Sequence, residues 1–156
     1  MQKIDRIVKA VSLDKTIEVL DYVNNNGGAT LDLDCNVVTF NDGYQFAMEL
    51  PICYEVSCAG GVNISDVQDA LCAIQSELKN IQAQVINAGV DKVMYIGIWR
   101  DKAKHMIIIE PSFYTDNLIA SIILGIENHQ EAIFDWSTKS DIKLKDFKNL
   151  MKKGGR

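Results

Sequence analysis

The chain has 156 residues, a formal net charge of −5 and four cysteines. A chain of this length forms one domain and buries roughly two-thirds of its unfolded surface, so neither metals nor disulfides are required for stability. Its N-terminus, MQKIDRIVKA, lacks an apolar core of signal-peptide length, and no apolar run approaches the ~20 residues that span a bilayer. We therefore expect a cytoplasmic protein that does not enter membranes.

The charge is distributed unevenly along the chain. Residues 141–156 carry six basic and two acidic residues, a balance of +4, which leaves −9 on residues 1–140. An acidic body argues against nucleic acid as its partner, because affinity for nucleic acid comes largely from neutralising phosphates. The basic segment could contact nucleic acid or an acidic partner, or it could be a solvated helix end that is favoured by the helix dipole.

The cysteines give no metal-binding or redox motif. Cys35, Cys53, Cys58 and Cys72 include no C-x-x-C pair. We expect reduced, mostly buried thiols rather than a metal site, and we assign no cofactor.

Two long stretches have the apolar spacing of amphipathic helices. The first follows Ser12 and ends in the NNNGG sequence at residues 24–28, where Asn and Gly tolerate the left-handed backbone that closes helices. The second begins at Ser65, which is placed to form a capping box with Gln68, and it ends at Gly89. Both helices are expected to lie on the surface with one face toward the core.

A third helix is predicted over residues 116–128, with Thr115 as its cap. Its apolar residues are Leu118, Ile119, Ile122, Ile123 and Ile126. This spacing predicts a buried helix that lies on the sheet.

Short β-branched and aromatic stretches bounded by turn residues predict the strands. These strands cover residues 29–33, 37–41, 44–50, 93–100, 105–110 and 131–136, and residues 52–57 could add an edge strand. Asp42 and Gly43 form a hairpin signal that would join the second strand to the third. The MIII run at residues 106–109 favours a central strand, and Pro111 is expected to end it.

Together these elements predict a single α+β domain over residues 1–140. It would consist of a mainly antiparallel sheet of five to seven strands packed with three principal helices. A short basic amphipathic C-terminal helix and a mobile tail are expected over residues 141–156.

Aromatic residues mark a candidate binding surface. Tyr95 and Trp99 alternate with aliphatic residues along one predicted strand, so both would lie on the same face of the sheet. Arg100 and Asp101 follow at the strand end and could add directed polar contacts, and Trp136 is a further candidate. The alternative is that this face packs beneath a helix.

No residues combine into a catalytic pattern, and no catalytic residue is assigned. His105 and His129 have no nucleophile or carboxylate placed beside them by the sequence, and each reads as a surface or helix-end residue. Asp32 and Asp34 could form a carboxylate pair, although solvated strand residues are the simpler interpretation. The nucleotide-binding, zinc-protease and calcium-loop motifs are absent from the sequence.

Four sequence patterns resemble a set of small phage-encoded and prophage-encoded proteins of unknown function. The patterns are GGAT at residues 27–30, DGY at 42–44, YIGIWRD at 95–101 and QEAIFD at 130–135, within a match that covers roughly residues 20–140. The resemblance implies a phage or mobile-element setting and carries no particular activity. This chain departs from the pattern at its end, where a Lys-rich helix stands in place of a short Gly-rich tail.

The favoured function is therefore binding. The first hypothesis is a phage accessory protein in the host cytoplasm whose acidic body inhibits a host defence or regulatory protein, because acidic proteins can occlude basic surfaces. The alternative is a small-ligand-binding protein with an aromatic pocket near Tyr95, Trp99 and Arg100. An enzyme is the least favoured reading, and self-association stays open.

Overall fold

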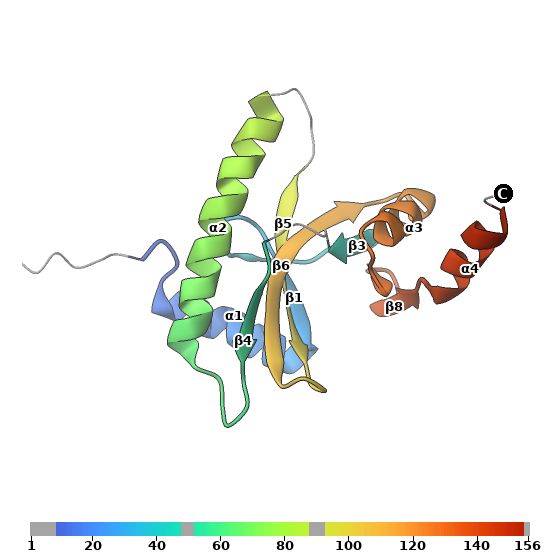
Figure 1. Ribbon diagram of the computed structural model, residues 1–156. Helices are drawn as coiled ribbons and strands as arrows, with labels where there is room; N and C mark the ends of the chain where they lie inside the picture. The colour runs from blue at the N-terminus through green and yellow to red at the C-terminus, as the bar shows by residue number, and fades with distance from the viewer. Residues whose placement is uncertain (1–8, 48–51, 88–92, 155–156) are drawn as a thin grey trace, which may run out of the picture.

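The computed structural model describes residues 9–47, 52–87 and 93–154 of this protein (Figure 1). The helices are α1 (Leu13–Asn26), α2 (Ile64–Asn87), α3 (Leu118–Glu127) and α4 (Lys145–Gly154). The strands are β1 (Gly28–Leu31), β2 (Val37–Val38), β3 (Tyr44–Ala47), β4 (Tyr54–Ser57), β5 (Met94–Asp101), β6 (Met106–Thr115), β7 (Ala132–Asp135) and β8 (Ser140–Lys143). The predicted α+β domain with a short C-terminal helix is confirmed, and its sheet has eight strands in the described residues.

The sheet is organised around the hairpin of β5 and β6. Its strand order is β2-β1-β5-β6-β3-β7-β8, with β4 also paired to β6, and every pairing is antiparallel. On the edge of β6 away from β5, residues 106–109 pair with β4 and residues 112–115 pair with β3. The long β6 thus joins two parts of the sheet, and it curves between them in Figure 1.

Pro111 does not end its strand as the sequence suggested. It lies inside β6 opposite Ile96. The Cys58 N–H donates to the His105 carbonyl, 2.8 Å away. Because backbone groups alternate in direction along a strand, the N–H and C=O groups of the odd-numbered residues of β6 point toward the edge shared by β4 and β3. Pro111 falls where that edge changes partner, so its missing N–H costs no ladder hydrogen bond.

The hairpin predicted at Asp42 and Gly43 is also wrong. Gly43 has the positive φ of +88° that the turn signal implies, but β3 pairs with β6 and β7 and not with β2. The turn chemistry was readable from local sequence, whereas the strand partner depends on contacts far along the chain.

Helix caps agree with the sequence at one helix and differ at two. The Ser12 side chain accepts from the Lys15 N–H at 3.1 Å and caps α1 as predicted. At α2 the Asn63 side chain, not Ser65, accepts from a first-turn N–H. The Asn117 side chain caps α3 in place of Thr115.

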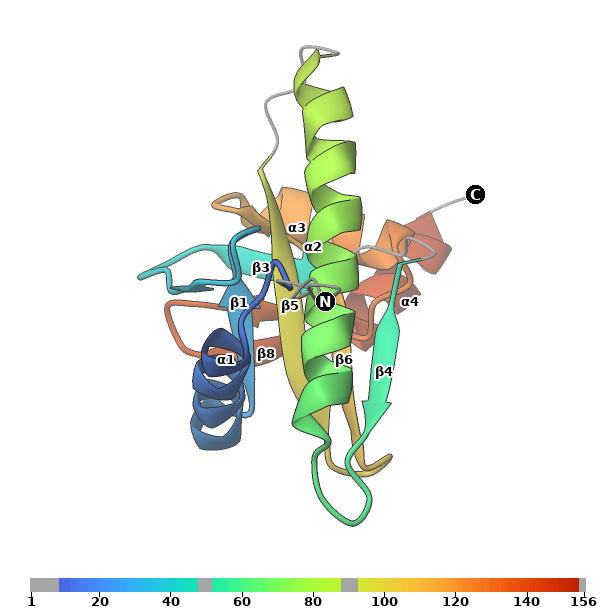
Figure 2. The ribbon, with the colours of Figure 1, turned by 90° about the vertical axis from the view of Figure 1, so that its left-hand side faces the viewer.

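Two apolar cores lie on one face of the sheet, defined by the alternation of side chains along the strands. The larger core joins α1 and α2 to residues such as Leu31, Ile96 and Ile109. The smaller joins α3 and the start of α4 to Phe46 and Ile133. Figure 1 shows that the twisted sheet carries α3 well away from α2, and in the view of Figure 2 α3 lies behind α2.

The expectation that α3 is buried is wrong for Leu118, Ile119 and Ile123, whereas Ile122 and Ile126 pack against the smaller core. The buried positions of α3 are Ser121 and Gly125. A Cβ on Gly125 would lie 2.8 Å from a Leu144 methyl carbon, so the helix approaches its core through small residues. Ile119 therefore points outward with 70% of its surface exposed, and Ile123 is also exposed.

The C-terminal segment joins the sheet before α4 begins. Residues 141–143 belong to β8, which pairs with β7, and the Leu144 side chain is fully buried. Of the helices in the described part of the chain, none combines the length and hydrophobicity needed to span a bilayer.

Candidate functional site: an aromatic face of the sheet

The opposite face of the sheet carries the aromatic residues. All four helices place apolar side chains in the two cores, so none packs on this second face within the described ranges. We call it the open face, and alternation assigns the following strand residues to it. They include Tyr95, Gly97 and Trp99 of β5, Ile108, Glu110, Ser112 and Tyr114 of β6, Gln45 of β3, Glu55 of β4 and Phe134 of β7.

Five aromatic side chains form a cluster at one end of the open face. Phe40 is its centre: its ring stacks on Tyr114 with 3.9 Å between centroids and meets Tyr95 and Trp136 edge-on at 5.6 and 5.5 Å. Phe134 packs edge-on against Trp136 at 5.0 Å. Each of the five is half-buried, and the ring contacts hold the side chains in place against one another.

Buried hydrogen bonds fix this cluster to the sheet. The Trp136 Nε1–H donates to Gln45 Oε1 at 3.0 Å, and Gln45 Nε2 donates to Ser112 Oγ at 2.9 Å. Gln45 and Ser112 are buried, and no described buried side-chain polar atom lacks a partner. A fully satisfied network of this kind holds the indole in one orientation.

Three carboxylates lie near two tyrosines of the cluster. The Tyr114 hydroxyl donates to the Asp42 carbonyl at 3.0 Å. Burial raises the pKa of Tyr114, and the nearby charges of Asp42 and Asp116 raise it further. Burial and then the charge of Asp32 raise the pKa of Tyr95 in the same direction. We call Asp32, Asp42 and Asp116 the acidic rim.

Trp99 lies at the other end of the open face. Its side chain is 39% exposed, and its Nε1–H donates to Glu110 Oε1 at 3.0 Å. Burial raises the pKa of the Glu110 carboxyl, and the hydrogen bond from Trp99 partly opposes that rise. The indole is thus held over the sheet by a partly desolvated carboxylate.

Replacing Glu110 with glutamine is expected to remove part of the pH dependence of stability. A carboxyl whose folded-state pKa is raised stabilises the fold below its ordinary pKa of 4.5, and this contribution is lost as pH rises through the raised value. E110Q keeps an acceptor for Trp99 without the desolvated charge. Urea unfolding should show that the stability of E110Q relative to wild type increases as pH rises above 4.5. An unchanged difference across that window would contradict the assignment.

The five residues singled out in the sequence do not form one site. Tyr95 and Trp136 meet in the cluster through Phe40, and Trp99 shares their face about 13 Å along β5 from Tyr95. The Arg100 side chain points to the opposite face of the sheet, where its Nη1–H donates to Asn24 Oδ1 of α1 at 3.1 Å. Asp101 accepts from the Lys104 N–H and so holds the turn between β5 and β6.

Three aromatic residues of the cluster were missed by the sequence interpretation. Phe40 was placed in the strand predicted over residues 37–41, but β2 ends at Val38 and Phe40 lies in the segment between β2 and β3, where strand alternation does not apply. Tyr114 lies beyond Pro111, at which the strand was expected to end. Phe134 was placed in a strand, and its alternation with Ile133 was the signal that could have assigned it to this face.

The described residues do not assemble a catalytic or metal centre. His105 and His129 occupy turns with φ of 52° and 56°. Asp32 accepts from the backbone N–H of Asp34 and Asn36, while the Asp34 carboxylate pairs with Lys79, so the two acids serve different partners. No group of three metal-ligating side chains occurs within the ranges that the structure describes.

A groove of about 380 Å³ lies between β4 and α2, and another of about 170 Å³ lies beside α1. Neither groove is lined by a residue of the aromatic cluster. Comparison with protein-family models, with curated proteins and with solved structures gives no match to this chain.

Proposed function

We propose that this protein acts by binding a basic surface of another protein through its open face. The observation that carries the proposal is the aromatic cluster, which no described helix covers and beside which the acidic rim lies. Protein interfaces commonly have an aromatic centre with a polar rim. The open face has this arrangement before any partner is bound.

The rigidity of the face favours binding. The stacked rings and the hydrogen bonds from Trp136 to Gln45 and from Gln45 to Ser112 hold the aromatic surface in place. Binding would therefore cost little conformational entropy on this protein's side of the interface. Trp99 adds an exposed indole of the kind that often dominates binding energy.

The charge favours a basic protein as the partner. The acidic rim lies beside the cluster, and residues 1–140 carry −9 in total. Opposite charge at a rim accelerates association and selects among partners, whereas the phosphates of nucleic acid would be repelled.

The phage resemblance suggests which class of protein this would be. In a phage or mobile-element setting, a host defence or regulatory protein with a basic nucleic-acid-binding surface has the required charge. Our protein would occupy that surface in the host cytoplasm and so exclude the nucleic acid.

Capture from a bacterial host extract with paired baits tests the proposal. The first variant, Asp42→Asn with Asp116→Asn, neutralises two rim charges, and the control, Asp14→Asn with Asp21→Asn, makes the same change on exposed positions of α1. Wild type and control should retain one basic protein that elutes as salt rises, and the rim variant should bind it roughly tenfold more weakly. Equal retention by both variants would overturn the role of the rim.

A further inference from the structure

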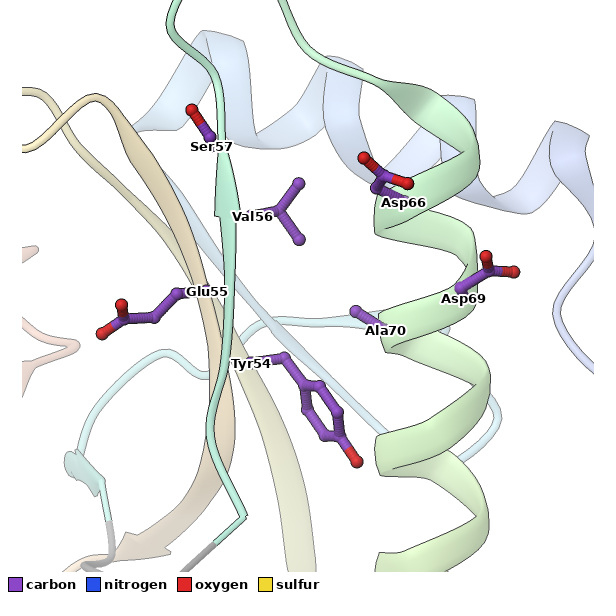
Figure 3. A pocket seen from close by; sticks show the side chains of 7 residues that line it. All are labelled: Tyr54, Glu55, Val56, Ser57, Asp66, Asp69 and Ala70. Carbon is purple, nitrogen blue, oxygen red and sulfur yellow. The ribbon is translucent and has the colours of Figure 1, made fainter.

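The groove between β4 and α2 is separate from the open face and has a different character. It has a volume of about 380 Å³ and lies on the side of β4 that faces the helix. Figure 3 shows the side chains of Tyr54 and Val56 pointing from β4 toward α2, while Ala70 and Asp66 of α2 point back toward the strand. A strand and a helix thus form its two walls.

β4 is an edge strand with a free side. It pairs with β6, and no other described strand pairs with it. Because the Cys58 N–H donates to the His105 carbonyl, alternation turns the backbone groups of Tyr54 and Val56 toward β6 as well. The N–H and C=O groups of Glu55 and Ser57 must then point away from the sheet, at the mouth of the groove.

The side chains of the groove define what could lie there. Val56 and Ala70 are buried and form an apolar floor. Asp66 is exposed in the first turn of α2 and forms no ion pair with a described residue. The other carboxylate of the helix wall, Asp69, is paired with the Lys9 ammonium group at 2.5 Å. The groove is therefore apolar at its base, and Asp66 is the carboxylate of the helix wall that is left for a basic group.

We propose that this groove binds an extended peptide segment of a partner protein, which adds to β4 as a further strand. The free backbone groups of Glu55 and Ser57 would pair with the segment, a known mode of peptide recognition. Alternate side chains would point into the groove, a small apolar one over Val56 and a lysine or arginine beside Asp66.

Charge also selects against a second copy of this chain as the occupant. Antiparallel pairing of two β4 strands would bring Glu55 of one copy close to Glu55 of the other, and like charges that face each other across strands are destabilising. A basic segment instead gains from Glu55 and Asp66. This inference does not rest on the proposed function of the open face.

The probe is a fluorescently labelled peptide about eight residues long, in which valine and lysine take turns at every second position with threonine between them, so that one face of the added strand carries both. Its first control has the same sequence with N-methyl groups on alternate backbone nitrogens, which keeps the charge but removes strand pairing. The protein variants are Ser57→Pro, which removes an outward N–H from an edge strand without disturbing the ladder to β6, and Ser57→Ala, which removes only the hydroxyl. Fluorescence anisotropy reports affinity, and circular dichroism confirms that each variant is folded.

We expect saturable binding of the probe to wild type and to Ser57→Ala. The probe should bind Ser57→Pro about tenfold more weakly, and the N-methylated peptide should bind wild type about tenfold more weakly than the probe does. Asp66→Asn should weaken binding severalfold, whereas Trp99→Ala should leave it unchanged. A failure of the open face to bind a protein would therefore not affect this result. Absence of saturable binding, or equal affinity of the two peptides, would overturn strand addition. A dimer of the free protein that dissociates in the Ser57→Pro variant would also overturn the proposal, because a second copy of the chain would then occupy the edge of β4.

Discussion

Replacing Gly43 with alanine is expected to destabilise the folded protein by roughly 2–4 kcal/mol. The backbone there has a φ of +88°, which costs an alanine about 1 kcal/mol or more. The added Cβ would also lie 2.2 Å from the Tyr114 hydroxyl oxygen and 2.4 Å from two ring carbons. That ring is stacked on Phe40, so it cannot move aside without opening the aromatic cluster.

The chain offers a matched control at Gly60. Its φ is +79°, and a Cβ there would meet nothing within 4 Å. Gly60→Ala should therefore show only the backbone cost of about 1 kcal/mol. Urea denaturation of both variants measures the difference. Equal losses would mean that Tyr114 accommodates the methyl group and that the cluster is less rigid than its contacts indicate.

Truncation of Trp99 to alanine is expected to weaken binding of the basic partner by about thirtyfold or more, because a tryptophan that is a hot spot of an interface typically contributes at least ~2 kcal/mol. The free protein should remain folded, since the indole lies on the surface and is 39% exposed. Isothermal titration with the captured partner measures the affinity.

Ile119→Ala is the control for Trp99→Ala. Ile119 is 70% exposed on α3, so this variant also removes exposed apolar surface, but it does so away from the open face. Its affinity for the partner should match that of wild type. If Ile119→Ala loses the partner and Trp99→Ala keeps it, the binding surface is α3, and the assignment of the open face is wrong.

Local sequence signals were sufficient for the fold class and for most elements. The hairpin of β5 and β6 could be predicted because its strands are long, β-branched and joined by a short polar turn. Pairings between distant segments could not be predicted from local sequence, as β3 shows. The signal at Asp42 and Gly43 specifies a turn, but the pairing of β3 with β6 and β7 depends on core contacts of Phe46 that no local pattern encodes.

The candidate site was predictable only where strand alternation applies. Alternation placed Tyr95 and Trp99 on one face, as the structure has them. It could not show that Phe40, from a segment without regular structure, would link Tyr95 to Trp136. Arg100 was grouped with Trp99 because the two are adjacent in sequence, yet adjacent strand residues point to opposite faces and Arg100 contacts α1 instead.

Side-chain oxidation footprinting of the complex tests the central claim most directly, because it reports which side chains a partner covers. Hydroxyl radicals oxidise exposed indoles rapidly, and Trp99 is exposed in the free protein. With the partner bound, we predict that oxidation of Trp99 and Tyr95 slows severalfold while oxidation of Ile119 and Ile123 on α3 is unchanged. Unchanged oxidation of Trp99 in a saturated complex would contradict the account, because the partner would then lie elsewhere on the protein.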